Sequence, residues 1–146
     1  LRAVLNTNKR SIDAASFFTT KLKAYDMLEV GELITGIEIP KMEGYVSGYE
    51  KFRLREAIDF AIASVAYAYK VTDGVIEDAR VVLGGVAPVP LELIEVEDFL
   101  KGKAVSDDLA AEAAALAVKD ADPLQYNAYK VNEVQALVRR SFSGLK

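Results

Sequence analysis

The sequence contains no cysteine and no histidine among its 146 residues. The absence of cysteine excludes disulfides, thiolate metal sites and cysteine nucleophiles. The absence of histidine excludes a histidine-based catalytic triad, histidine metal ligands and acid–base catalysis by imidazole. The usual components of a self-contained active site are therefore missing, and we expect no catalytic residue and no metal ligand in this chain.

The chain also lacks long hydrophobic runs and an excess of positive charge. No apolar stretch approaches ~20 residues, the length that a helix needs to cross a bilayer. No signal peptide is visible, so we expect a cytoplasmic protein. The net charge of −4 gives no electrostatic argument for nucleic-acid binding. Because the first residue is leucine and not methionine, we treat the chain as a fragment, and the sequence does not tell whether the natural chain extends N-terminally of Leu1.

What is present is an ordinary globular composition, with 51% hydrophobic and 27% charged residues. In the first part, residues 1–42, we expect a short strand at the N-terminus and one helical turn capped by Ser11 or Asp13. Alternation over residues 32–39 predicts a strand that Pro40 ends. Its predicted faces are Leu33, Ile37 and Ile39 on one side and Glu32 and Glu38 on the other.

The second part begins with three alternating runs, at residues 45–55, 61–71 and 75–85. Asp73 and Gly74 separate the last two and predict a type I′ hairpin, because that turn needs positive φ at both central residues. In the first run, Val46, Phe52 and Leu54 share one face, and Tyr49, Lys51, Arg53 and Arg55 the other. Apolar faces of the next two runs are Val65, Tyr67 and Tyr69, and Ala79, Val81 and Leu83, the latter opposite Asp78 and Arg80.

Three helical patterns follow the strands, at residues 91–102, 106–121 and 127–140. Gly102 is expected just after the end of the first helix, and Ser106 is expected to cap the second. Strands followed by helices, without βαβ alternation, indicate an α+β fold. We predict an antiparallel sheet of three to four strands with about three helices packed on one face.

The basic stripe Lys51, Arg53 and Arg55 is the feature with the most chemical potential. Three cations on one strand face could bind a phosphate, a carboxylate or the negative charge of a reduced flavin. The alternative is a solvated face, or pairing with the nearby acids Glu50, Glu56 and Asp59.

A second cluster consists of acids on the first predicted helix, namely Glu92, Glu95, Glu97 and Asp98. A carboxylate metal site is one interpretation, but without histidine and on an exposed helix face, solvation is favoured. From the residues alone, the chain is an α+β domain without an autonomous active site.

Four motifs occur in an order, and with gaps, that are typical of one enzyme family. Lys51, Arg55 and Asp59 stand four residues apart, just before a strand of small apolar residues. The other motifs are Gly-Gly-Val-Ala-Pro at 84–88 followed by Pro90, Glu97-x-x-Leu100-x-Gly102, and the upstream segment 17–40. Together they resemble the C-terminal domain of the FAD-binding (medium) subunit of molybdenum hydroxylases, the family of xanthine dehydrogenase and carbon monoxide dehydrogenase flavoproteins.

The chain departs from the family pattern at two places. Glu92 stands where many members have arginine, and Asn127 to Lys130 stand where many have Ser-x-Glu-Tyr-Arg. The second departure resembles the variant of bacterial purine or N-heterocycle hydroxylase subunits. The family's glycine-rich FAD pyrophosphate loops precede this region and do not occur in the chain. The resemblance thus implies that residues 1–42 are the tail of the FAD-binding second lobe with a connecting strand, and that residues 43–146 are the flavoprotein C-terminal domain.

The resemblance also implies roles for the basic stripe. Lys51 would lie beside the isoalloxazine of FAD, with Tyr49 and Arg53 as further cofactor-binding residues. Arg55 and Asp59 would support the flavin-side loop through an ion pair. FAD itself would be bound mainly by the missing N-terminal lobes.

The implied enzyme is a multi-subunit molybdenum–flavin oxidoreductase in which this fragment alone catalyses nothing. Its partners would be a large subunit with molybdopterin and a small subunit with 2Fe-2S clusters, and electrons would pass through FAD to NAD or another acceptor. The alternative is a stand-alone, non-enzymatic α+β module that binds a ligand or another protein. The sequence determines neither the substrate nor the final acceptor nor the subunit stoichiometry.

Overall fold

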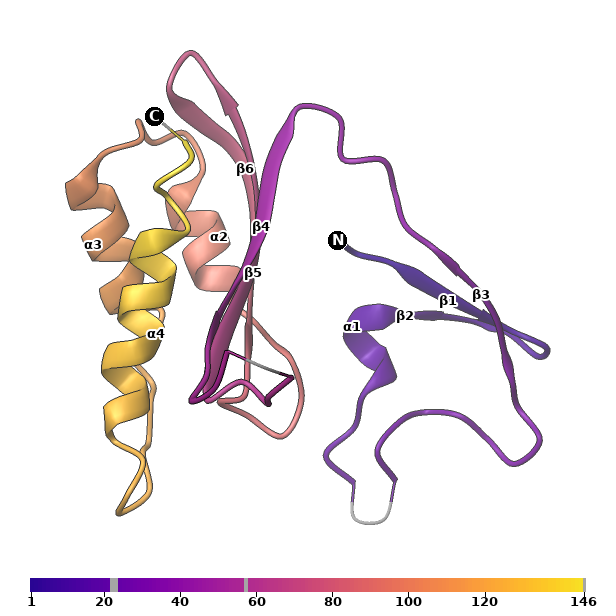
Figure 1. The fold of residues 1–146 in the computed structure, drawn as a ribbon. Coiled ribbons are helices and arrows are strands. Elements are labelled where there is room, and N and C mark those ends of the chain that lie inside the picture. The colour runs from indigo at the N-terminus through magenta and orange to yellow at the C-terminus, as the bar shows by residue number, and fades with distance from the viewer. Residues whose placement is uncertain (22–23, 57, 146) are drawn as a thin grey trace. The chain divides into compact units, whose positions relative to one another are not determined.

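A computed structural model describes the chain except for residues 22–23, 57 and 146 (Figure 1). The chain divides into two compact units. Unit 1 comprises Leu1–Glu43 with Pro88–Pro90, and unit 2 comprises Gly44–Ala87 with Leu91–Lys146. Each unit has a sheet of its own. The assignment of residues 1–42 to the tail of a FAD-binding lobe stays a prediction.

Unit 1 contains a three-stranded antiparallel sheet in the order β2-β1-β3 and one short helix. Its elements are β1 (Val4–Thr7), β2 (Ser11–Asp13), α1 (Ala14–Phe17) and β3 (Ile34–Glu38). The predicted helical turn is present, and of its two predicted caps Asp13 stands at the N-cap position whereas Ser11 does not. Asp13 occupies the N-cap position without a side-chain hydrogen bond to the helix, and Ser11 lies in β2, where it donates to Asn6.

Glu32 was expected on the polar face of a strand but lies outside β3 and is buried. Its carboxylate accepts hydrogen bonds from Arg10 Nε at 3.0 Å and the Thr7 hydroxyl at 2.7 Å, and also from the backbone N–H of Glu29 at 2.8 Å. These contacts, led by the one from Arg10, lower the pKa of Glu32 to about 2. Glu32 therefore crosslinks the loop before β3 to the β1–β2 turn.

Unit 2 is a layer of helices on a four-stranded antiparallel sheet in the order β4-β5-β6-β7 (Figure 1). Its strands are β4 (Tyr45–Phe52), β5 (Ala63–Thr72), β6 (Val75–Gly84) and β7 (Leu91–Glu92). Its helices are α2 (Ile94–Leu100), α3 (Asp107–Leu116) and α4 (Tyr129–Arg140). The predicted α+β class, with an antiparallel sheet and helices on one face, is confirmed. Among the described residues, no helix is long and apolar enough to cross a membrane.

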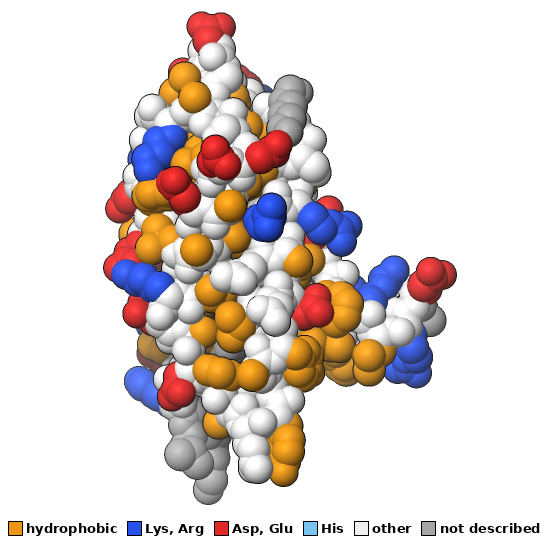
Figure 2. Space-filling model, turned by 90° about the vertical axis from the view of Figure 1, so that its left-hand side faces the viewer, with side chains coloured by type: hydrophobic (Ala, Val, Ile, Leu, Met, Phe, Trp, Pro, Cys, Tyr) orange, Lys and Arg blue, Asp and Glu red, His pale blue; other side chains and the backbone are white. Residues whose placement is uncertain are grey.

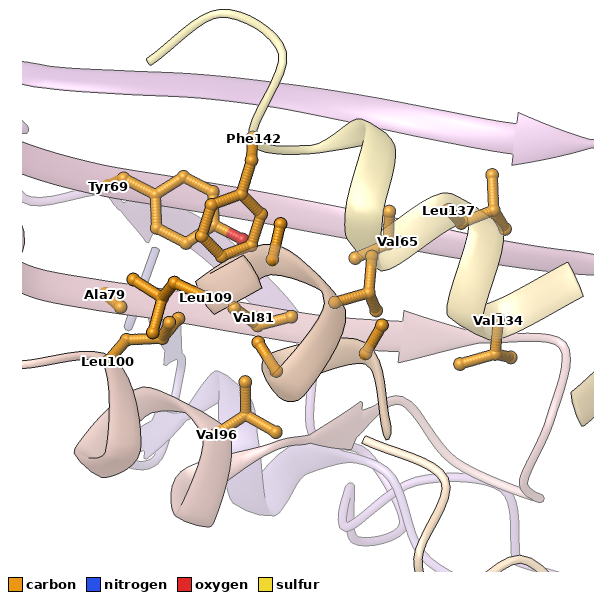
Figure 3. Packing of buried hydrophobic residues seen from close by; sticks show 14 of the residues in the cluster. Val65, Tyr69, Ala79, Val81, Val96, Leu100, Leu109, Val134, Leu137 and Phe142 are labelled. Carbon is orange, nitrogen blue, oxygen red and sulfur yellow. The ribbon is translucent and has the colours of Figure 1, made fainter. Parts of the chain in front are cut away.

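The core lies between the sheet and the helices, where the predicted apolar faces of β5 and β6 meet side chains from α2, α3 and α4 (Figure 3). Tyr69 is fully buried at its centre, and its ring packs on Phe142 with 5.2 Å between ring centroids. The Tyr69 hydroxyl forms a 2.7 Å hydrogen bond with Ser141, whose own hydroxyl donates to the carbonyl of Val138. Burial raises the pKa of Tyr69.

The outer side of unit 2 shows the expected amphipathic helices. In the view onto the helical side, hydrophobic side chains lie among acidic and basic ones (Figure 2).

The predicted helix ends are also present. Ser106 accepts a hydrogen bond from the backbone N–H of Leu109 at 3.0 Å, so the predicted N-cap of α3 is confirmed. Gly102 has a φ of 76° just after α2, as the predicted helix end requires.

The far edge of β6 is closed by segments that are not part of a long strand. Gly102 N–H donates to Ile76 O, and Ile76 N–H donates to Lys103 O at 2.9 Å. Further along the same edge, the Glu97 carboxylate accepts from the N–H of Val81 at 2.9 Å. Glu97 is therefore buried, and the expectation that all four acids of α2 and its approach are solvated is wrong at this residue. Its carboxylate takes the place of a neighbouring strand's carbonyl.

The Asp73-Gly74 turn provides a test of the hairpin. Both residues have positive φ, 51° for Asp73 and 75° for Gly74, which confirms the backbone that a type I′ turn needs. Because a β-branched side chain is strained there, Gly74→Val should lower the free energy of unfolding by roughly 1–3 kcal/mol. Denaturant titration measures the loss, and Gly74→Asn is the control, since asparagine tolerates this region better. An unchanged midpoint for the valine variant would show that the turn does not constrain the fold.

Candidate functional site

The candidate site begins where β4 ends. The sequence predicted that this strand continues to Arg55, but β4 stops at Phe52, whose carbonyl accepts from the N–H of Ile62 at 2.9 Å. This bond closes the base of a loop, residues 53–62, which leads into β5. The alternation of Lys51, Arg53 and Arg55 is compatible with a strand, but β5 begins only at Ala63 and offers no partner beyond Phe52.

The loop is held by a polar cluster around Asp59. Its carboxylate accepts from Arg55 Nε at 3.2 Å, from Arg55 Nη2 at 3.3 Å and from the N–H of Phe60 at 3.0 Å. The Asp59 carbonyl accepts from Lys51 Nζ at 3.0 Å. The hydrogen bond from Arg55 is the main cause that lowers the pKa of Asp59. Lys51, Arg55 and Asp59, which stand four residues apart in the sequence, therefore meet in one cluster.

Lys51 and Tyr49 lie on the face of the sheet opposite the helices. Their partners on β5 are Ser64 and Ala66, which alternate with the core residues that face the helices. Gly84 is the partner of Ser64 on β6, so a floor of small residues lies beside the lysine and the tyrosine. The sequence analysis missed this floor, although small residues at alternate positions of β5 were a usable signal.

The remaining predicted site residue, Arg53, is exposed and lies outside both the strand and the Asp59 cluster. Three large apolar side chains of the same loop, Leu54, Ile58 and Phe60, are also more than 80% exposed, at 82%, 102% and 93%. The loop therefore presents both a cation and apolar groups. On the neighbouring exit from β6, Gly85 has a φ of 74°, and a Cβ there would lie 3.0 Å from the carbonyl oxygens of Ala61 and Ile62. This close approach accounts for the second glycine of the Gly-Gly-Val-Ala-Pro motif.

Comparison with known families identifies the family to which this fold belongs. Residues 47–145 match the family described as the CO dehydrogenase flavoprotein C-terminal domain. The chain belongs to this family. The family resemblance expected from the motifs is thereby confirmed, and the cofactor of the family is FAD.

Relatives of the chain include subunits of two oxidoreductases. It is 37% identical over 117 residues to the glyceraldehyde dehydrogenase medium chain of Sulfolobus acidocaldarius, covering 80% of this chain and 41% of that protein. It is 30% identical over 138 residues to the nicotine 6-hydroxylase medium subunit of Paenarthrobacter nicotinovorans, covering 91% and 47% respectively. The chain therefore spans less than half the length of these two relatives.

A solved structure shares the fold. Carbon monoxide dehydrogenase from Hydrogenophaga pseudoflava, in a form that lacks the Mo-pyranopterin moiety of its molybdenum cofactor, matches with a TM-score of 0.84 and 27% identity. The match covers 96% of this chain and 51% of that one.

The residues of the site suit the flavin ring of FAD but not its pyrophosphate. An ammonium group, a phenol and a floor of small residues suit the edge and face of a flavin ring, where negative charge develops on reduction. A pyrophosphate needs backbone N–H donors from glycine loops or helix N-termini, and the sequence has no glycine-rich fingerprint of that kind. In the described part of the chain, no group of three or more potential metal ligands occurs.

The Asp59 cluster gives a pH-dependent prediction. Because the pKa of Asp59 is lowered by folding, its contribution to the loop is complete above its ordinary value of 3.8 and is lost as the pH falls through the lowered pKa. The amide proton of Phe60 should therefore exchange faster with solvent at acidic pH than its intrinsic rate predicts. Asp59→Asn should cause faster exchange already at neutral pH, as measured by NMR.

Glu56→Gln is the matched control, since it removes a neighbouring carboxylate that has no part in the Asp59 cluster. Equal acceleration of Phe60 exchange in both variants would contradict the role of Asp59.

Proposed function

We propose that this chain is the part of a FAD-binding medium subunit that closes the ring side of the flavin site in a multi-subunit molybdenum hydroxylase. In this proposal, a large subunit with molybdopterin oxidises the substrate, and a small subunit with 2Fe-2S clusters passes electrons to FAD. From FAD, the electrons would pass to NAD or another acceptor, and the complex would work in the cytoplasm. Family membership supports the proposal, as do the names of the relatives.

The observation that carries the proposal is the position of Lys51. Its ammonium group is anchored to the Asp59 carbonyl by one of its three donors, which leaves two for a ligand. Arg55 holds Asp59, so the position of the lysine depends on the ion pair behind it. Bound FAD supplies two-electron redox chemistry, and Lys51 would stabilise negative charge at the ring edge. Tyr49 would border the ring on the same strand, and Arg53 would add a second, exposed cation.

The substrate we propose is an aldehyde or an N-heterocycle such as a purine. Two relatives match this chain although one is named for glyceraldehyde and the other for nicotine. In this proposal, the choice between such substrates lies outside the matched region, at a molybdenum centre on another subunit.

A first prediction concerns cofactor binding by the isolated chain. Because the donors for the pyrophosphate are missing, calorimetric titration of this chain with FAD should give no tight binding. A subunit that also contains the preceding lobes should bind FAD and serves as the control. Tight, stoichiometric binding by the chain alone would contradict the proposed division of the flavin site.

A second prediction concerns the flavin potential in the full subunit. Lys51→Ala should leave FAD bound but lower its reduction potential, because a cation favours the anionic reduced form. For a two-electron couple, roughly 30 mV corresponds to about 1.4 kcal/mol. A partly exposed charge interaction of about 1 kcal/mol would thus shift the potential by about 20 mV. A spectroscopic redox titration measures this shift.

Two further variants serve as controls for the titration. Lys51→Arg should leave the reduction potential of the flavin close to the wild-type value, since the positive charge is retained. Arg55→Ala should mainly loosen the loop, because its contacts are to Asp59, and should change the potential less than Lys51→Ala, since the lysine charge is retained. If Lys51→Ala leaves both potential and turnover unchanged, the lysine is a solvated surface residue and the proposed role is wrong.

A further inference from the structure

A pocket in unit 2 shares no residue with the cluster around Lys51. It has a volume of about 490 Å³ and opens between the start of α2, the end of α3 and the start of α4. Pockets that bind small molecules commonly measure roughly 300–1,000 Å³. The pocket is therefore large enough for a ligand of one or two rings.

The base of the pocket is formed by the hydrophobic core of unit 2. Leu83 of β6, Val96 of α2 and Val134 of α4 line the pocket and are buried members of the core cluster. Further apolar side chains, from the approach to α2 and the end of α3, extend the walls outward, among them Leu93 and Val118. The apolar body of a ligand would displace water from these walls, which favours binding.

The charged residues of the lining carry an excess of negative charge. They provide four carboxylates and two ammonium groups, from Glu92, Glu95, Asp120, Asp122, Lys119 and Lys130. Lys119 forms an ion pair with Glu95, and Lys130 donates to the carbonyl of Gly85 at 2.7 Å. Both ammonium groups are therefore already engaged within the protein. The remaining charge disfavours an anionic ligand and favours a cationic one.

Two of the carboxylates lie where the pocket meets solvent. Asp120 and Asp122 belong to the connection between α3 and α4, and both residues are exposed. The Asp120 carboxylate lies 3.9 Å from Lys119 Nζ, at the limit of an ion pair, and Asp122 forms no ion pair with another described residue. Because water reaches both side chains, a ligand at the mouth of the pocket can reach them as well. An apolar interior below an acidic mouth is complementary to an organic cation.

We propose that this pocket binds an organic cation of one or two rings. Its apolar body lies against the walls from the sheet and the helices, and its ammonium group lies at the mouth beside Asp120 and Asp122. The inference rests on the pocket alone and not on the proposed flavin role.

Calorimetric titration of the purified chain tests the proposal with three ligands that share one ring system. At neutral pH, 2-naphthylmethylamine is a cation, 2-naphthylmethanol is neutral and 2-naphthoate is an anion. We expect saturable binding of one equivalent of the cation, about tenfold weaker binding of the alcohol and still weaker binding of the anion. A tenfold preference is the scale of two partly exposed ion pairs. Added salt should weaken the binding of the cation but not that of the alcohol. No saturable binding of the cation, or equal affinity for the cation and the alcohol, would overturn the proposal.

Variants of the protein locate the binding. Asp120→Asn combined with Asp122→Asn should abolish the preference for the cation and leave the affinity for the alcohol unchanged. Glu56→Gln combined with Glu112→Gln is the matched control, since it removes the same charge from two exposed residues that do not line the pocket. Val131→Phe should block the pocket for both ligands, with thermal unfolding as the check that the protein is folded.

Three outcomes would contradict the site. The preference for the cation could persist in the double aspartate variant, or it could fall equally in the control, which would assign it to the net charge of the chain. Full affinity for the cation in folded Val131→Phe would show that the ligand binds elsewhere.

Discussion

Tyr69 of β5 is buried against the end of α4, and this contact joins the sheet and the helices of unit 2. The site depends on this contact. The ring packs on Phe142 and the hydroxyl bonds Ser141, so the tyrosine fixes the end of α4 both by shape and by a polar contact. An aromatic pair of this kind adds about 0.5–1.5 kcal/mol beyond the burial of its area. Because the period of a strand is two, committing one face of β5 to the helices leaves the opposite face for Lys51 and its floor of small residues.

In the Asp59 cluster, one residue both orders a loop and holds the side chain of a nearby lysine. Its side chain orders the loop through Arg55 and Phe60, while its backbone carbonyl restrains the ammonium group of Lys51. The side-chain contacts are local and partly exposed, so they are worth little to global stability. Their effect is to restrict the position of the Lys51 ammonium group, as the role that we propose for this residue requires.

Local rules were sufficient for much of the fold. The Asp73-Gly74 hairpin and the Ser106 cap follow from residues within a few positions, and both are present as predicted. The failures involve partners distant in sequence. Glu97 is buried because the N–H of Val81 lies beside it, 16 positions away, which no helical periodicity reveals. The end of β4 at Phe52 could not be predicted from the sequence. Alternating basic residues look the same whether they belong to a strand or to the loop that follows it. The family resemblance identified the fold and the family, whereas the roles of the site residues await experiment.

The closed edge of β6 has a consequence for how the chain behaves at high concentration. Gly102, Lys103 and the Glu97 carboxylate occupy backbone groups there that could otherwise pair with another molecule. On the opposite side, β4 is the outermost strand of the described sheet. Within unit 2, this part of the β6 edge is therefore protected from strand pairing with another molecule, whereas no strand of the described sheet covers β4. Loosening the segment after α2 would expose these backbone groups of β6 to pairing with another molecule.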